Sequence, residues 1–131
     1  MRKSKKPIVM ATWKHGYNAN LKAYEVLHNN GIALDAVEFG INVTELDSKV
    51  RTVGYGGYTD DEGKVTLDAC IMDHLGNAGS VVYLQDIKNP ISVARKVMEK
   101  SNHVMLAGAG AQSFALKNGF EKKNILYSKS K

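Results

Sequence analysis

The sequence has few of the residues that define several common classes of protein. Cys70 is the single cysteine, so no disulfide can form within the chain, which argues against a disulfide-stapled secreted module. No apolar run approaches the roughly 20 residues that a membrane-spanning helix needs, so no membrane partner is expected. The histidines at 15, 28, 74 and 103 have neither ligand spacing nor a cysteine cluster nearby. The sequence therefore predicts neither a bound metal ion nor another cofactor.

The positive charge is concentrated at the two ends of the chain. Residues 1–6 carry four Lys or Arg side chains, and residues 121–131 carry four Lys against Glu121. Without these ends, the 18 basic and 13 acidic residues of the chain fall to 10 and 12. Aromatic residues do not interleave with the basic ones, as a face that binds single-stranded nucleic acid requires. We therefore expect flexible tails at 1–6 and 124–131 and no nucleic-acid partner.

The N-terminal residues also bear on targeting. Basic residues open the chain, as they do in a signal peptide, but the apolar segment from Pro7 to Trp13 is too short to be the middle of one. We therefore expect that this sequence contains no signal peptide.

The remaining pattern is that of one α/β (α+β) domain. The composition is 44% hydrophobic and 24% charged, close to that of an ordinary globular protein. The hydrophobic periodicity and the positions of Gly and Pro predict two single strands, one hairpin of two strands, and four helices. In chain order these are a buried strand at 8–12, a helix at 20–30, a helix from 33, a hairpin of strands at 65–72 and 80–84, a helix from 90, a strand at 104–106 and a helix at about 110–118.

Three local features refine this prediction. The helix from residue 33 carries a stripe of mostly small residues (Ala33, Ala36, Val37, Gly40, Ile41 and Thr44), which permits close packing against a neighbour. Asn89 is expected to cap the helix that Pro90 begins. A sheet of so few strands, beside four helices, would have edges that are open to pairing. We therefore expect another chain to complete the sheet.

Few residues suggest chemistry by themselves. Cys70 lies in an alternating strand, where a small buried hydrophobe is a commoner role than a nucleophile. The Gly108–Gly110 segment lacks the third glycine of a dinucleotide loop and predicts a tight strand-to-helix turn. The acidic residues 60–62 predict a solvated turn rather than a cation site. Trp13 directly follows the first predicted strand, so it could face a ligand cleft or anchor a core or interface.

Many motifs in this chain resemble the glycosylasparaginase family in their order and spacing. Each is weak alone, but together they cover nearly the whole chain and are specific. They are Pro7–Val9 with Thr12–Trp13, Gly31 with Ala33–Glu38, Val53–Gly57, Val65–Asp73, Gly79–Val81, Ile87–Glu99, His103–Leu106 and Gly119–Phe120.

The resemblance implies half of a four-layer αββα N-terminal nucleophile hydrolase sandwich. Residues 1–131 would be the α chain, part of a single domain completed by the β chain of the same precursor in an (αβ)₂ heterotetramer. Autoproteolysis would expose the nucleophile, a Thr at the start of the β chain. The assembly would cleave the side-chain amide of N-acetylglucosaminyl-asparagine, a small glycosyl-amino acid, and release aspartate. This chain would supply no catalytic residue and be inactive alone, but Trp13 would line the substrate pocket.

Two alternative functions remain open, one within the same superfamily and one outside it. The segment Lys88–Ser92 is also similar to that of isoaspartyl peptidase/L-asparaginases, although those enzymes have a His-Gly-Gly motif where this chain reads Thr12–Gly16. His15 stands where the glycosylasparaginase branch often has another aromatic residue, so the pocket wall is expected to differ there. The other alternative is a non-catalytic binding module that lacks its β half. The resemblance implies a periplasmic location in a bacterium and a lysosomal one in a eukaryote.

Overall fold

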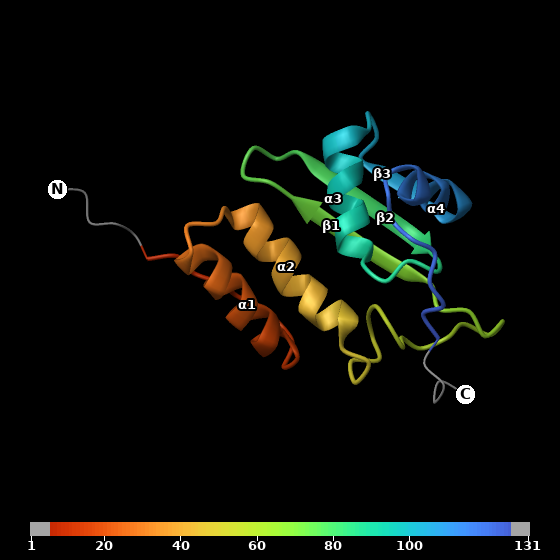
Figure 1. The fold of residues 1–131 in the computed structure, drawn as a ribbon, viewed down its shortest axis with the longest axis horizontal. Coiled ribbons are helices and arrows are strands. Elements are labelled where there is room, and N and C mark those ends of the chain that lie inside the picture. The colour runs from red at the N-terminus through yellow and green to blue at the C-terminus, as the bar shows by residue number, and fades with distance from the viewer. Residues whose placement is uncertain (1–5, 127–131) are drawn as a thin grey trace.

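A computed structural model of the chain describes residues 6–126, which contain four helices and three strands in a mixed α/β arrangement (Figure 1). This agrees with the predicted fold class. None of the helices within these residues is long and apolar enough to cross a membrane. In chain order, the elements are α1 (Gly16–His28), α2 (Ala33–Leu46), β1 (Leu67–Met72), β2 (Ala78–Leu84), α3 (Pro90–Lys100), β3 (Met105–Ala107) and α4 (Gly108–Lys117).

The three strands form one sheet in the order β1-β2-β3. Strands β1 and β2 are the predicted antiparallel hairpin, and their connection is held by Asp73, whose Oδ1 accepts the N–H groups of Leu75 and Asn77 at 2.8 and 2.9 Å. Strand β3 pairs with β2 in parallel, with Ser80 opposite Met105. A parallel pair needs a crossover connection, and α3 provides it. Helices α3 and α4 consequently lie against the sheet (Figure 1).

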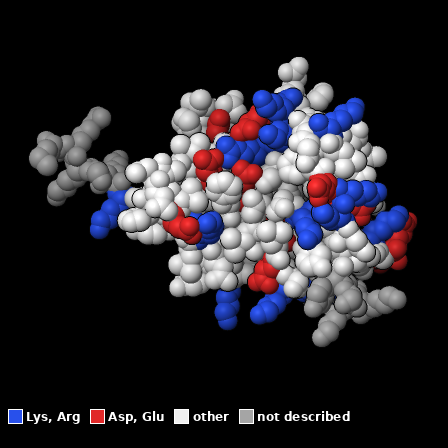
Figure 2. Space-filling view, viewed as in Figure 1, with Lys and Arg blue, Asp and Glu red and all other residues white. Residues whose placement is uncertain are grey.

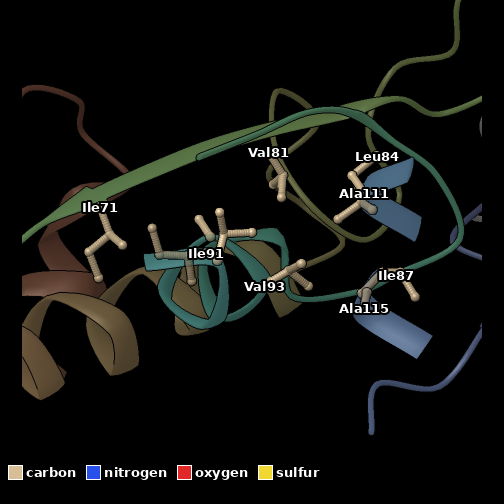
Figure 3. Packing of buried hydrophobic residues seen from close by; sticks show 10 residues of the cluster. Ile71, Val81, Leu84, Ile87, Ile91, Val93, Ala111 and Ala115 are labelled. Carbon is tan, nitrogen blue, oxygen red and sulfur yellow. The ribbon is translucent and has the colours of Figure 1, made fainter. Parts of the chain in front are cut away.

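The main hydrophobic core lies between the sheet and these two helices. Figure 3 shows side chains from β1, β2, α3 and α4 converging in this layer. Each large apolar side chain that is fully buried stabilises the fold by about 1.5–3 kcal/mol. The buried members of the cluster are Ile71, Val81, Leu84, Ile87, Ile91, Val93, Ala94, Val97, Ala111 and Ala115.

Helices α1 and α2 form a hairpin that lies beside this core (Figure 1). The predicted small-residue stripe explains how closely they approach. A Cβ atom on Gly40 would meet the carbonyl oxygen of Ala19 at 2.8 Å and Ala23 Cβ at 3.3 Å. The buried side of α1 is therefore made by small residues, whereas Leu21 and Tyr24 remain more than half exposed.

The prediction of a strand at residues 8–12 is wrong. This segment has no strand hydrogen bonds, and Ile8 and Met10 are 83% and 87% exposed. Apolar residues in a row indicate a tendency to be buried, but a strand also needs a neighbour that offers main-chain donors and acceptors. Within the described residues, no strand pairs with this segment.

The expected burial of Cys70 is also wrong, although its strand was predicted correctly. Along β1, alternate side chains such as Leu67 and Ile71 face the core, so Cys70 and Met72 project from the opposite face of the sheet. The side chain of Cys70 is exposed and lines an open cavity on this face.

The expected tails lie mostly outside the described residues, which exclude 1–5 and 127–131. The part of the C-terminal tail that is described contains Ile125, which is 2% exposed and packs against Val65 and Leu67. Its carbonyl oxygen accepts the N–H of Gly56 at 2.9 Å. The chain is therefore packed against the domain at Ile125.

Candidate functional site

An open cavity of about 760 Å³ lies where the segment before α1, the C-terminal end of α2, the loop before β1 and the start of α3 meet the sheet. Most of its wall is apolar, and a few polar groups converge on it, which is the usual make-up of a ligand site. A second cavity of about 240 Å³ lies beneath residues 8–11, but Asn20 is the one polar side chain in its lining. The larger cavity is therefore the candidate site.

Trp13 lines this cavity and is 73% exposed. Its ring stacks on that of His15 with 6.3 Å between centroids and 4° between the planes. The turn that carries both rings closes when Gly16 donates its N–H to the carbonyl oxygen of Trp13 at 2.9 Å. A Cβ on Gly16 would lie 2.3 Å from Ala11 Cβ, so glycine permits the chain to fold back here. His15 thus acts as a flat stacking partner, as an aromatic residue at this place would.

Glu45, at the end of α2, is a buried carboxyl group in the cavity wall, with 2% of its surface exposed. Its Oε1 accepts the N–H of Ile91 at 2.9 Å, and its Oε2 lies 3.5 Å from Nδ2 of Asn89. Burial raises the pKa of Glu45 to about 7; the two hydrogen bonds oppose this shift and the charge of Glu38 adds to it. The predicted cap by Asn89 is not formed. Glu45 caps α3 instead.

Residues 52–54, at the start of the glycine-rich loop Gly54–Gly57, form the wall next to Glu45. Gly54 has a φ of 61°, and Tyr55 donates its N–H to the carbonyl oxygen of Glu45 at 2.7 Å. Outside the cavity, Lys88 Nζ lies 4.8 Å from the centre of the Tyr55 ring. The loop is thereby tied to α2 on one side and to the segment before α3 on the other.

Asp68 lines the cavity from β1 but serves the sheet. The pairing of β1 with β2 is irregular between Leu67 and Ala69, and there Asp68 Oδ1 accepts the N–H of Tyr83 at 2.8 Å. Tyr83 has a φ of 55°, a backbone conformation that bulky residues seldom adopt. The carboxylate replaces a lost ladder bond and holds this strained residue in place.

The other sequence features have structural roles. Gly108, with a φ of 53°, begins α4 directly after β3, as the predicted strand-to-helix turn requires. Asp60 Oδ1 accepts the N–H groups of Glu62 and Lys64 within the predicted turn. No group of three or more His, Cys, Asp or Glu side chains in residues 6–126 could hold a metal ion.

The charged side chains are mixed in sign. In Figure 2, basic and acidic groups lie next to one another, and much of the surface over α1 and α2 carries no charge. The best-connected group is Arg95 of α3, which forms ion pairs with Asp35 and Glu38 of α2, both at 2.6 Å, and with Glu99 at 2.8 Å. This cluster joins the two helices outside the cavity.

Comparison with known proteins gives the context of this cavity. The family model described as asparaginase matches residues 3–131. The chain belongs to the asparaginase family. It is 58% identical over 125 residues to an N(4)-(β-N-acetylglucosaminyl)-L-asparaginase of Elizabethkingia miricola and 43% identical over 120 residues to that of Rattus norvegicus. The alignments cover 95% and 91% of this chain, but 37% and 34% of those relatives.

A plant-type L-asparaginase of Pyrococcus horikoshii is also similar, with 50% identity over 95 residues, or 72% of this chain and 31% of the relative. This asparaginase-family chain thus spans about a third of the length of these relatives. The resemblance to glycosylasparaginases, and hence to N-terminal nucleophile hydrolases, is confirmed.

Sequence reasoning predicted that Trp13 lies at a cleft, but it missed Glu45. In the sequence, Glu45 is one of several acidic residues near the end of a helix, and its burial depends on a contact with a residue 46 positions away. A weak signal was present in the segment Val53–Gly57, because glycine-rich backbone permits the close approach of two chain segments.

Proposed function

We propose that this chain is the α chain of an amidohydrolase that cleaves the side-chain amide of N-acetylglucosaminyl-asparagine. The support is its 58% identity to a glycosylasparaginase together with the position of Trp13 on an open cavity. The catalytic Thr would stand at the N-terminus of a β chain formed by autoproteolysis of one precursor. The two chains would make a four-layer αββα domain, paired as (αβ)₂.

The proposed reaction needs a hydroxyl group and a free α-amine on one residue. The Thr hydroxyl attacks the side-chain carbonyl carbon of the substrate while its proton passes to the α-amine. Fixed donors stabilise the oxyanion, the C–N bond breaks, and the departing amine takes the proton. Water then hydrolyses the resulting ester, which releases aspartate and restores the Thr hydroxyl.

This chain would contribute the substrate-binding wall rather than the reacting atoms. All of its threonines are internal, so none offers a free α-amine. Trp13, supported by the ring of His15, offers a flat apolar surface of the kind that packs against a sugar ring or an amino-acid stem.

The location of the protein would be periplasmic in a bacterium and lysosomal in a eukaryote.

A second candidate is an isoaspartyl peptidase or plain L-asparaginase. The 50% identity to a plant-type L-asparaginase favours it over unrelated functions. A third, a binding module without its β half, would keep the cavity but catalyse nothing.

The test is to express the gene that encodes this chain and to analyse every polypeptide that copurifies with it. We expect a second chain that begins with Thr and a higher kcat/KM for N-acetylglucosaminyl-asparagine than for β-aspartyl dipeptides or asparagine. This chain produced alone is the control and should be inactive. A preference for the dipeptide would establish the second candidate, and a stable monomer with no partner would overturn the α-chain assignment.

A further inference from the structure

Three separate segments of the cavity wall meet at Glu45. The residue lies in the last turn of α2. Its side-chain carboxyl group accepts the N–H of Ile91 from α3, and its main-chain carbonyl accepts the N–H of Tyr55. Gly54 packs directly on its backbone, since a Cβ there would lie 2.1 Å from the carbonyl oxygen of Glu45. A change at this one residue therefore reaches the loop and the start of α3 together.

The start of α3 depends on this carboxyl group. Pro90 occupies the first helical position and has no N–H, so the N–H of Ile91 is the first main-chain donor that the helix offers. Asn89 makes no cap bond, because its Nδ2 donates to Asn42 Oδ1 at 2.9 Å and lies 3.5 Å from Glu45 Oε2. Glu45 thus takes the role of a capping residue from a distant part of the chain.

No basic side chain in the described residues forms an ion pair with this carboxyl group. Glu38, one of its neighbours on α2, repels a charge on Glu45 and is itself bound by Arg95 of α3. From the other segments, Lys88 lies over the Tyr55 ring, and Arg51 lies over the Tyr58 ring at 4.9 Å. Within residues 6–126, the groups that favour a charge on Glu45 are its hydrogen-bond donors, Ile91 and Asn89.

We infer that Glu45 is a positioning residue of the cavity: its carboxyl group holds the start of α3, its main-chain carbonyl holds the loop at Gly54, and the carboxyl group makes substrate affinity depend on pH. The identity of the substrate rests on the proposed function, whereas the positioning role of Glu45 does not.

The direction of the pH effect follows from burial. Because burial is the main cause of the raised pKa of about 7, the surrounding structure accommodates the neutral acid better than the carboxylate. Raising the pH through this value places an unpaired charge in the wall, and water entering to solvate it loosens the contacts of Ile91 and Tyr55. Substrate that needs the closed wall then binds less tightly.

The test compares Glu45→Gln with the wild type in the assembled enzyme. Glutamine keeps an oxygen that can accept the N–H of Ile91 but cannot ionise. Between pH 6 and pH 8, the KM for N-acetylglucosaminyl-asparagine should rise about fivefold more in the wild type than in Glu45→Gln. The pH dependence of kcat should be the same in the two proteins. Glu25→Gln, which removes an exposed carboxylate on α1, is the matched control and should behave as the wild type.

A second measurement is independent of catalysis. Amide hydrogen exchange, corrected for its intrinsic pH dependence, should become faster at 51–58 and 89–95 in the wild type above pH 7, and should stay constant in Glu45→Gln. Parallel KM profiles and parallel exchange in the two proteins would overturn the inference. If the substrate is not cleaved at all, the proposed function fails, and the exchange result alone decides the role of Glu45.

Discussion

Trp13 is the side chain that we propose to serve substrate binding rather than stability. Its indole is largely exposed and lines the cavity, so its removal opens no void in the core. In the proposed αβ enzyme, Trp13→Ala should raise KM for the proposed substrate, N-acetylglucosaminyl-asparagine, about tenfold, with a smaller effect on kcat. Tyr17→Ala removes a similarly exposed aromatic ring that does not line the cavity, and KM should not change. Equal KM values for the two variants would contradict the predicted role of Trp13.

Gly54 is required by both backbone conformation and space. It has a positive φ of 61°, and a methyl group there would overlap the main chain of Glu45, which cannot move without shifting α2. Gly54→Ala should therefore lower the free energy of unfolding by about 3 kcal/mol or more. Gly63→Ala separates the two causes, because φ is 77° there but nothing lies within 4 Å of the added methyl. That variant should lose only about 1 kcal/mol, measured by urea unfolding.

At the scale of elements, Glu45 joins α2 to α3, and its titration should appear in their stability. Its pKa is near 4.5 in the unfolded chain and about 7 in the fold, so the folded state binds the proton more tightly. The stabilisation is complete below about pH 4.5 and is lost as the pH rises through about 7, by about 3 kcal/mol in all. Urea midpoints between pH 4.5 and pH 8 should fall more steeply in the wild type than in Glu45→Gln. Identical slopes would show that the carboxyl group is ionised in the fold throughout.

Elements that depend on nearby residues could be predicted from the sequence. The β1–β2 hairpin follows from alternation and from a turn that Asp73 closes locally, and α3 follows from Pro90 and a buried stripe. The segment at 8–12 could not be assigned correctly, since a strand is defined by a partner rather than by its own residues. The same limit applied to the cavity: the position of Trp13 after an apolar run left a ligand cleft and a core or interface anchor open, and only the family resemblance implied the pocket. Glu45 was missed because only tertiary contacts bury it.

At the scale of the whole molecule, the described residues expose apolar side chains on α1 with the segment before it, on α2, and on the sheet face that carries Cys70 and Met72. Contiguous apolar surface of this kind is typical of a face that another polypeptide covers. In the proposed αββα assembly, a second sheet would pack on the Cys70 face of β1. The exposed thiol therefore reports directly on whether the proposed partner is present.

Maleimide labelling of Cys70 should thus distinguish the chain alone from the assembled enzyme. In the chain produced alone, the thiol should react at a rate close to that of a small free thiol, because it is exposed. In the assembly, we expect a rate at least about tenfold lower, since a packed sheet excludes the reagent. A Leu75→Cys variant in the Cys70→Ser background places a thiol in the exposed hairpin turn, as a control for reagent access. Equal rates at Cys70 in both states, with the control unchanged, would mean that this face stays open, and the four-layer arrangement would have to be abandoned.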